Sequence, residues 1–291
     1  MYTPCFLVFG LAAFAFGCCV ASFLNVCIWR IPRGESVILP PSHCPKCNAR
    51  ILWYQNVPIL SWLILRGRCA ACHEPISPRY AVVETLGGAL FLLTYLQWAS
   101  PALMGVMPPL GMTAVADVWM VPVLWLVEAG LILGAFVDLA EFWIPDRVTV
   151  GGMLLGLPLS YLVPELQGVP GGPCQWSALG WSAGGLAFGF LFLWGVGWVF
   201  SKLFRREALG FGDVKLLGAL GAFFGPVAAL FVLIASSFVG AFAGLGLILR
   251  GKARLGGFTA VPYGPFIALG ALAWIYWGPT LVSWYMRAFG R

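Results

Sequence analysis

Long apolar runs separated by short polar stretches dominate the pattern of this chain. A helix that crosses a bilayer needs roughly 20 predominantly apolar residues. Runs near that length lie at 5–28, 80–98, 118–137, 148–165, 177–201, 214–228, 229–249 and 262–285. The pattern therefore predicts an all-α polytopic membrane protein with about eight transmembrane helices.

The sixth run, 214–228, is the least regular of the eight. It contains Gly218, Gly221, Gly225 and Pro226, and glycine and proline both weaken a helix interior. The run either spans the membrane alone or joins the seventh run in a re-entrant hairpin. The sequence leaves this point open.

Composition agrees with the pattern and excludes a soluble globular protein. The chain has 291 residues, of which 60% are hydrophobic and 10% are charged, and its mean hydropathy is +0.90. Soluble domains carry about 25% charged residues. The net charge of +6 is dispersed over several loops, so it indicates membrane topology and no nucleic-acid partner. The first run has no basic residues before it, which favours a retained helix over a signal peptide.

The loop charges orient the expected bundle. With eight spans, fifteen of the 17 Lys and Arg residues fall on one side, and Arg287 and Arg291 fall on the other. Cytoplasmic loops carry the excess of basic residues, so the richer side is cytoplasmic and both termini are outside. We therefore expect a first helix at 1–28, a cytoplasmic domain at 29–79, a second helix with an outer loop at 80–117, and a membrane-embedded domain at 118–291.

One acid stands out at the start of the sixth run, in the stretch Gly210-Phe211-Gly212-Asp213-Val214-Lys215. An acid in a membrane segment is costly and often functional, although a hydrated acid at a helix end is the simpler alternative. The neighbouring glycines let the backbone approach closely and relax the helix start. Acid–base chemistry at Asp213 would need a second acid at the same depth.

Asp138 is the best-matched partner for Asp213. It ends the third run and should lie just inside the same membrane face. Asp146 follows Pro145 and would lie about 12 Å further along, where we expect it to cap the next helix or pair with Arg147. Two neighbouring aspartates that share one proton form an aspartyl protease dyad. Spacing alone also permits two independent helix-end acids.

Four cysteines in the 29–79 segment indicate a metal site. Cys44-Pro45-Lys46-Cys47 and Cys69-Ala70-Ala71-Cys72 are C-x-x-C pairs at a spacing close to that of zinc ribbons. Disulfides, the alternative, rarely persist in the cytoplasm. We expect a closed structural Zn²⁺ site with His43 and His73 as bystanders, because four sulfurs complete a tetrahedron.

Taken together, the ordered motifs resemble the bacterial type IV prepilin leader peptidases, membrane aspartyl proteases that are also N-methyltransferases. The likeness rests on Ser22 to Val26 with Arg30 and Pro32; the four cysteines; Asn56 to Trp62 and Arg66 to Arg68; Pro75 to Ser77 with Arg79, Tyr80 and Glu84; Asp138 with Ile144 to Asp146; and Gly210 to Leu216. Any one piece is weak, and Gly-x-Gly-Asp also occurs in presenilin-like proteases. The ordered set is specific and covers nearly the whole chain.

The resemblance implies a concrete activity at named residues. Asp138 and Asp213 would be catalytic, and Cys44, Cys47, Cys69 and Cys72 would bind zinc. Substrates would be prepilins of type IV pili or pseudopilins of type II secretion, cleaved after a leader glycine at the cytoplasmic face of the bacterial inner membrane. The new N-terminus would be methylated with S-adenosylmethionine. We expect that second site where the 29–79 loop meets the membrane, without assigned residues.

Three alternatives remain from the residues alone. An intramembrane protease of presenilin type would leave the cysteine quartet unexplained. A non-enzymatic scaffold of a secretion system would use the zinc loop for docking. A transporter would use Glu128, which lies in the middle of the third run, to bind a proton or cation.

Overall fold

The computed structural model describes residues 3–99, 119–167, 174–205, 210–251 and 261–289. Most of the expected outer loop at 99–117 lies outside these ranges, as do Glu207, Lys252 and Arg254. The described residues form helices and loops. Among them there is no β-strand, and only two isolated β-bridges occur. The expectation of an all-α fold is confirmed.

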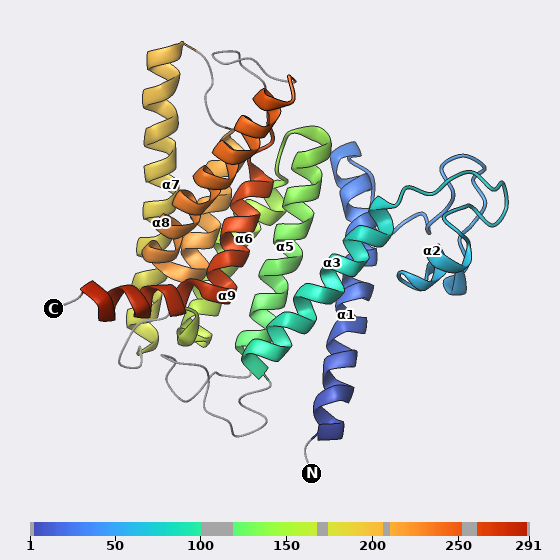
Figure 1. Cartoon of the computed structure of the whole chain (residues 1–291), viewed down its shortest axis with the longest axis horizontal. Coiled ribbons are helices and arrows are strands. Elements are labelled where there is room, and N and C mark those ends of the chain that lie inside the picture. Colours follow the sequence, from blue (N-terminus) through green and yellow to red (C-terminus); the bar gives the residue numbers. More distant parts are fainter. Residues whose placement is uncertain (1–2, 100–118, 168–173, 206–209, 252–260, 290–291) are drawn as a thin grey trace.

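Each apolar run forms a helix where the pattern predicts one (Figure 1). The helices are α1 (Thr3–Arg30), α2 (Leu60–Ile64), α3 (Arg79–Thr94), α5 (Met120–Glu141), α6 (Asp146–Leu162), α7 (Gln175–Phe204), α8 (Phe211–Leu249) and α9 (Gly264–Phe289). Five of them are long and apolar enough to cross a membrane, namely α1, α3, α5, α7 and α8. These five helices make the chain a multi-pass membrane protein. α8 contains two of the expected runs, and Gly264–Gly278 of α9 is a shorter apolar helix.

A sharp break at Gly225 divides α8 into segments 211–224 and 226–249. Gly225 has φ 82° and ψ 178°, which only glycine adopts without strain, and Pro226 follows it. The first segment is about 21 Å long, short of the roughly 30 Å apolar core of a bilayer. Ser236 on the second segment hydrogen-bonds Tyr263, which directly precedes α9. The chain therefore turns back within the bundle, as the hairpin alternative predicts.

The break frees backbone carbonyl groups inside the bundle, and buried side chains bind them. Pro226 has no N–H to donate to the carbonyl oxygen of Ala222. That oxygen instead accepts hydrogen bonds from Ser160, Ser182 and Gln167, at 3.0, 2.6 and 3.2 Å. Gln167 also donates to the carbonyl oxygen of Phe223 at 3.0 Å. The kink is therefore satisfied by polar groups from α6, α7 and the intervening turn.

The helices pack in two groups with α5 between them. α1 packs along α3 at one side, and α8 packs against α6, α7 and α9 at the other, while α5 contacts members of both groups. Gly185 of α7 and Gly221 of α8 lie backbone against backbone, as small residues permit in membranes. A Cβ atom at either position would clash with the backbone of the other helix.

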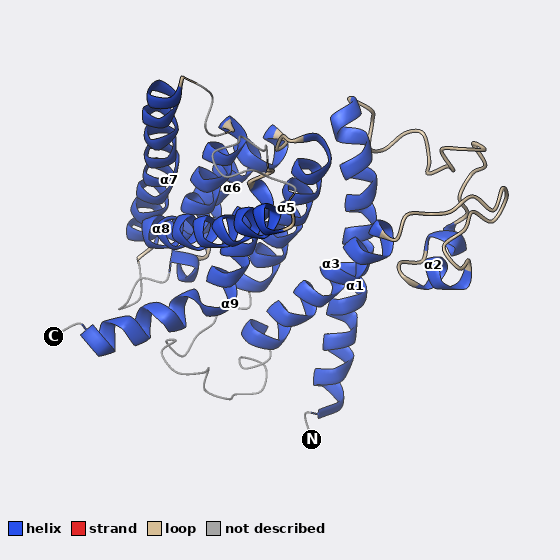
Figure 2. Ribbon diagram, turned by 45° about the horizontal axis from the view of Figure 1, so that its top comes forward, coloured by secondary structure: helices blue, strands red, loops and turns tan. Residues whose placement is uncertain are grey.

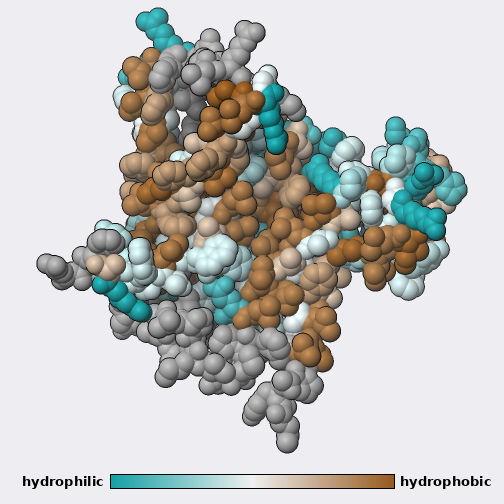
Figure 3. All heavy atoms as spheres, in the orientation of Figure 1, coloured by the Kyte–Doolittle hydropathy of each residue, from teal (hydrophilic) through white to brown (hydrophobic). Residues whose placement is uncertain are grey.

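A small lobe made of residues 31–78 lies beside one end of α1 (Figure 1). It contains mostly loop, in contrast to the helical bundle (Figure 2). Hydrophilic side chains gather on this lobe, whereas apolar side chains cover much of the visible helical surface (Figure 3). This distribution fits helices that face lipid and a lobe that faces water.

Candidate active site and metal centre

Asp138 lies near the C-terminal end of α5 and is 5% exposed. Its Oδ2 accepts a hydrogen bond from the backbone N–H of Gly264 at 2.8 Å. Gly264 is the first residue of α9, and the first N–H groups of a helix lack partners within the helix. The Asp138 carboxylate therefore sits at the positive end of the α9 dipole.

Asp213 lies in the first turn of α8 and is 8% exposed. It occupies the third helical position after Gly210, whose backbone N–H lies beside its carboxylate. Asp138 is close enough to interact electrostatically with Asp213, so the fold brings the two predicted acids to one place.

Ile144 joins the two aspartate-bearing helix ends. It is 4% exposed and lies in the turn between α5 and α6. A Cβ atom built on Gly212 would lie 3.3 Å from the Ile144 Cβ, and one built on Gly264 would lie 3.0 Å from its Cδ1. Ile144 belongs to the motif Ile144 to Asp146, but its sequence context predicts no role for it.

The glycines beside Asp213 act through close contact. Gly210 has φ −67° and ψ 135°, an ordinary extended conformation, so the expected need for unusual backbone freedom there is wrong. A Cβ on Gly210 would lie 3.0 Å from Asp213 Oδ2, and one on Gly212 would press against Ile144. The expectation of close backbone approach is the part that holds.

Asp146 begins α6 and forms an ion pair with Lys215, with 2.6 Å between Lys215 Nζ and Asp146 Oδ1. The expected pairing with Arg147 is therefore wrong. The reason is tertiary, because the start of α8 lies beside the start of α6. The Asp146 side chain is 68% exposed, in contrast to the buried Asp138 and Asp213.

Glu128 is fully buried in the middle of α5 and belongs to a polar network away from these acids. Its Oε1 accepts hydrogen bonds from Thr94 of α3 and from the Tyr276 hydroxyl of α9, the latter at 2.7 Å. The network ties three helices together. These hydrogen bonds explain the buried Glu128 as a structural residue, without the ion-binding role that the transporter alternative gives it.

The four predicted cysteines converge in the small lobe and form no disulfide. Their sulfur atoms all lie within 4.8 Å of one another, and the Cys44 and Cys72 sulfurs are 3.9 Å apart. Tetrahedral zinc with Zn–S bonds of about 2.3 Å requires sulfur–sulfur distances of about 3.8 Å. The residues present therefore fit a four-coordinate zinc ion.

The two cysteine pairs sit in matching turns. The N–H of Cys44 donates to Ala49 O and the N–H of Cys69 donates to Glu74 O, at 2.9 and 2.8 Å. The residue four positions after the first cysteine has a positive φ in each turn, 55° at Asn48 and 57° at His73.

Backbone N–H groups of Cys72 and Ala71 lower the pKa of the Cys69 thiol to about 6, which favours the thiolate that binds metals. Neither His43 nor His73 joins the four-sulfur group, as expected.

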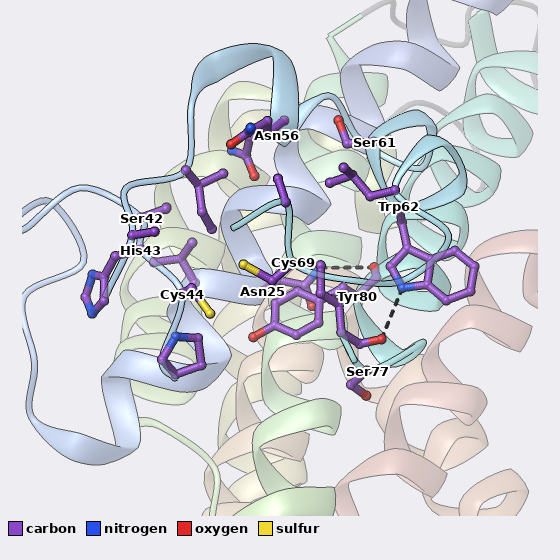
Figure 4. A pocket seen from close by; sticks show the side chains of 18 of the residues that line it. Asn25, Ser42, His43, Cys44, Asn56, Ser61, Trp62, Cys69, Ser77 and Tyr80 are labelled. Atoms are coloured by element: carbon purple, nitrogen blue, oxygen red, sulfur yellow. Dashed lines mark hydrogen bonds between the residues drawn. The ribbon is translucent and has the colours of Figure 1, made fainter. Parts of the chain in front are cut away.

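A cavity of about 620 Å³ lies between the small lobe, the end of α1 and the start of α3 (Figure 4). Its wall includes Asn25, Arg30, Trp62, Tyr80 and Glu84, and it reaches the metal site at Cys44 and Cys69. Trp62 donates its Nε1–H to Ile76 O at 3.3 Å, which fixes the indole ring at one side.

Two contacts connect the lobe and its cavity to the end of α5. Arg79 donates to the carbonyl oxygen of Phe136 at 3.3 Å, and Arg33 pairs with Glu141 at 3.6 Å. Both α5 residues are within three positions of Asp138. The cavity and the two buried aspartates therefore lie at the same end of the bundle.

Comparisons with known proteins match both parts of the chain. Residues 15–98 match the Bacterial Peptidase A24 N-terminal domain, and residues 125–245 match the Type IV leader peptidase family. A protein named Prepilin leader peptidase/N-methyltransferase from Aeromonas hydrophila is 35% identical, over 95% of this chain and 93% of the relative. One of the same name from Myxococcus xanthus is 37% identical, over 97% of this chain and 76% of the relative.

A third relative, from Escherichia coli, is named Type 4 prepilin-like proteins leader peptide-processing enzyme. It is 34% identical, over 89% of this chain and 91% of the relative. No solved structure matches this chain.

Proposed function

The chain belongs to the type IV leader peptidase family, and we propose that it cleaves the leader of type IV prepilins and type II secretion pseudopilins and then N-methylates the new N-terminus. Cleavage follows the leader glycine at the cytoplasmic face of the bacterial inner membrane. Asp138 and Asp213 are the catalytic pair. The metal-binding domain is 29–79, between the first helix at 1–28 and the second helix with its outer loop at 80–117. The peptidase domain is 118–291.

One observation carries the peptidase proposal. Two buried aspartates from distant parts of the sequence interact at one end of the bundle, and each lies at the start of a helix, α9 for Asp138 and α8 for Asp213. Asp146, by contrast, is an exposed acid that forms an ion pair with Lys215. Buried acids among membrane helices are usually functional.

The pair hydrolyses the peptide bond without a covalent intermediate. One aspartate takes a proton from water while the water oxygen attacks the scissile carbonyl carbon. The other, protonated aspartate donates to the carbonyl oxygen. When the intermediate collapses, the carbon–nitrogen bond breaks and the leaving nitrogen takes up a proton. The hydrogen bond from Gly264 holds the Asp138 carboxylate in place for these transfers, and Asp213 is fixed by its position in the first turn of α8.

The location of the pair suits a prepilin, which the resemblance describes as a membrane helix with a basic cytoplasmic leader. Its scissile bond lies where that helix leaves the bilayer. Phe142 and Trp143, in the turn beside Asp138, are 60% and 41% exposed and offer apolar contacts there. The helical stem of the substrate would lie laterally against the bundle.

Zinc and a methyl donor complete the proposal. Cys44, Cys47, Cys69 and Cys72 hold a structural zinc ion that leaves no open position for catalysis. S-adenosylmethionine supplies an activated methyl group. The free amine of the new N-terminus attacks the methyl carbon, the carbon–sulfur bond breaks with its electrons remaining on sulfur, and the nitrogen releases a proton to water.

Substitution of each acid tests the peptidase assignment. We expect Asp138→Asn and Asp213→Asn to reduce prepilin cleavage in membranes by at least about 10²-fold, because each removes a proton-transfer group. Asp146→Asn is the matched control and should retain most activity. Full processing by either active-site variant would refute the dyad. Retained cleavage by Asp138→Asn with loss in Asp146→Asn would identify Asp146 as the first acid.

A further inference from the structure

The cavity beside the small lobe contains a buried positive charge without a carboxylate partner. Arg30, at the end of α1, is 7% exposed. Its guanidinium donates to the carbonyl oxygens of Ser36 and Pro40 at 2.9 and 2.7 Å, and no carboxylate of the described residues forms an ion pair with it. Buried charges are normally paired, so the cavity is suited to receive an anionic group here.

The same cavity also contains a buried negative charge. Glu84 of α3 is 8% exposed and lines the cavity. Its Oε2 accepts the N–H of Ile59 at 2.8 Å, and its other oxygen accepts no hydrogen bond from the described residues. Among those residues no cation pairs with it either. A carboxylate in this setting favours a cationic ligand group.

Backbone strain accompanies this contact. Ile59 has φ 62° and ψ −54°, a conformation that β-branched residues rarely adopt. Ile59 directly precedes α2, which begins at Leu60. The hydrogen bond to Glu84 holds the strained peptide in place. Strained residues tend to cluster at functional sites.

Aromatic and amide side chains complete the wall. The ring of Tyr80 is 39% exposed and projects from α3 into the cavity, near Asn25 and Cys69 (Figure 4). Asn25 is 6% exposed and donates to Tyr80 O at 3.1 Å, so it braces the start of α3. The volume of about 620 Å³ lies within the range of small-molecule sites.

We propose that this cavity binds S-adenosylmethionine. The ligand has one carboxylate, an α-ammonium group, a cationic sulfonium and an adenine ring. Arg30 faces the carboxylate, Glu84 faces the sulfonium, and the adenine stacks on Tyr80. This assignment rests on the proposed methyltransferase activity and gives it residues. The contacts of Arg79 and Arg33 with the end of α5 place the cavity, and the methyl donor in it, at the end of the bundle where cleavage creates the new N-terminus.

Binding of the methyl donor to the purified, zinc-loaded full-length protein tests the assignment directly. Equilibrium dialysis with radiolabelled S-adenosylmethionine should give about tenfold weaker binding for Glu84→Gln, the equivalent of about 1.4 kcal/mol. The amide oxygen of this variant can still accept the Ile59 N–H, so the fold is kept. S-adenosylhomocysteine lacks the sulfonium charge, and its binding should change much less.

Two further variants separate ligand binding from folding. Tyr80→Ala should weaken both ligands because it removes the stacking ring. The matched controls Trp53→Ala and Glu141→Gln should bind like wild type, because neither residue lines the cavity. Zinc content near one ion per chain shows that the lobe is folded in each variant.

Wild-type binding by Glu84→Gln and Tyr80→Ala would overturn the assignment. So would unchanged methyl-donor binding with a raised KM for cleavage, since the cavity would then hold the substrate leader. A wild-type chain that binds the donor through these residues but cleaves no prepilin would support the assignment and refute the peptidase proposal.

Discussion

At the scale of single residues, the site depends on places where a side chain is missing. Gly264 lets the N–H at the start of α9 reach Asp138, and Gly212 lets α8 lie against Ile144. Neither residue has a positive φ. Both positions have a close neighbour that a Cβ atom would press against, Ile144 for Gly212 and Asp138 with Ile144 for Gly264.

Gly264→Ala tests this role. A Cβ at this position would lie 2.8 Å from Asp138 Oδ2 and 3.0 Å from Ile144 Cδ1, so one of them must move. We expect cleavage to fall about ten- to hundredfold while the protein stays folded, because catalysis is sensitive to small displacements. Prepilin cleavage and thermal unfolding in detergent measure the two effects.

Gly184→Ala is the control for that substitution. It adds the same methyl group to α7, where nothing lies within 4 Å of the new Cβ. Its activity should match wild type. Equal activity of Gly264→Ala would show that Asp138 tolerates the displacement and that the contact is incidental.

At the scale of elements, buried polar groups fix the broken and crossing helices. The Gln167 amide supplies the single side-chain hydrogen bond found for the Phe223 carbonyl among the described residues, and it helps to satisfy Ala222. Glu128 similarly joins α3, α5 and α9. In a bilayer such groups have no water to replace their partners.

Gln167→Leu should therefore weaken the kink in α8. Removal of the amide takes away the side-chain hydrogen bonds that it donates to the Phe223 and Ala222 carbonyls, at a cost of about 0.5–1.5 kcal/mol each. We expect the thermal unfolding temperature in detergent to fall by several degrees. The exposed Gln175→Leu serves as the matched control and should unfold near the wild-type temperature. No difference between the two would mean that lipid or water satisfies the carbonyl.

At the scale of the whole molecule, the chain combines a helical bundle that carries the aspartates with a lobe that carries the metal ligands. Arg33 and Arg79 connect the lobe to the end of α5. The cavity lies between the lobe and the first two long helices. In the proposed function, cleavage and methylation use different residues at the same end of the bundle.

Metal removal should separate the two activities. The lobe has little regular structure, so its fold depends on the four-sulfur site, and zinc loss should unfold it. We expect a chelator, or Cys44→Ser, to abolish methyl-donor binding and to expose 31–78 to protease. Cleavage should be reduced less, because the aspartates lie in the bundle.

Metal content provides the check on that prediction. The purified protein should contain about one zinc ion per chain. A protein with four reactive thiols and well below one zinc per chain, yet a protease-resistant lobe, would contradict a structural zinc site.

The sequence by itself determined the helical membrane fold, because apolar runs of bilayer length have few other uses. It also determined the metal ligands, since two C-x-x-C pairs can converge through short turns. The break in α8 was visible in Gly225 and Pro226, although the sequence could not choose between a span and a hairpin.

Only the tertiary structure decided which groups meet across the bundle. Spacing could match Asp138 to Asp213 in depth, but the contact depends on Ile144 and on the start of α9, more than 100 residues from Asp138. The same reason explains why Asp146 pairs with Lys215 and why Arg30 and Glu84 line one cavity. Helix packing sets these contacts, and the local sequence pattern does not predict which helix faces pack against one another.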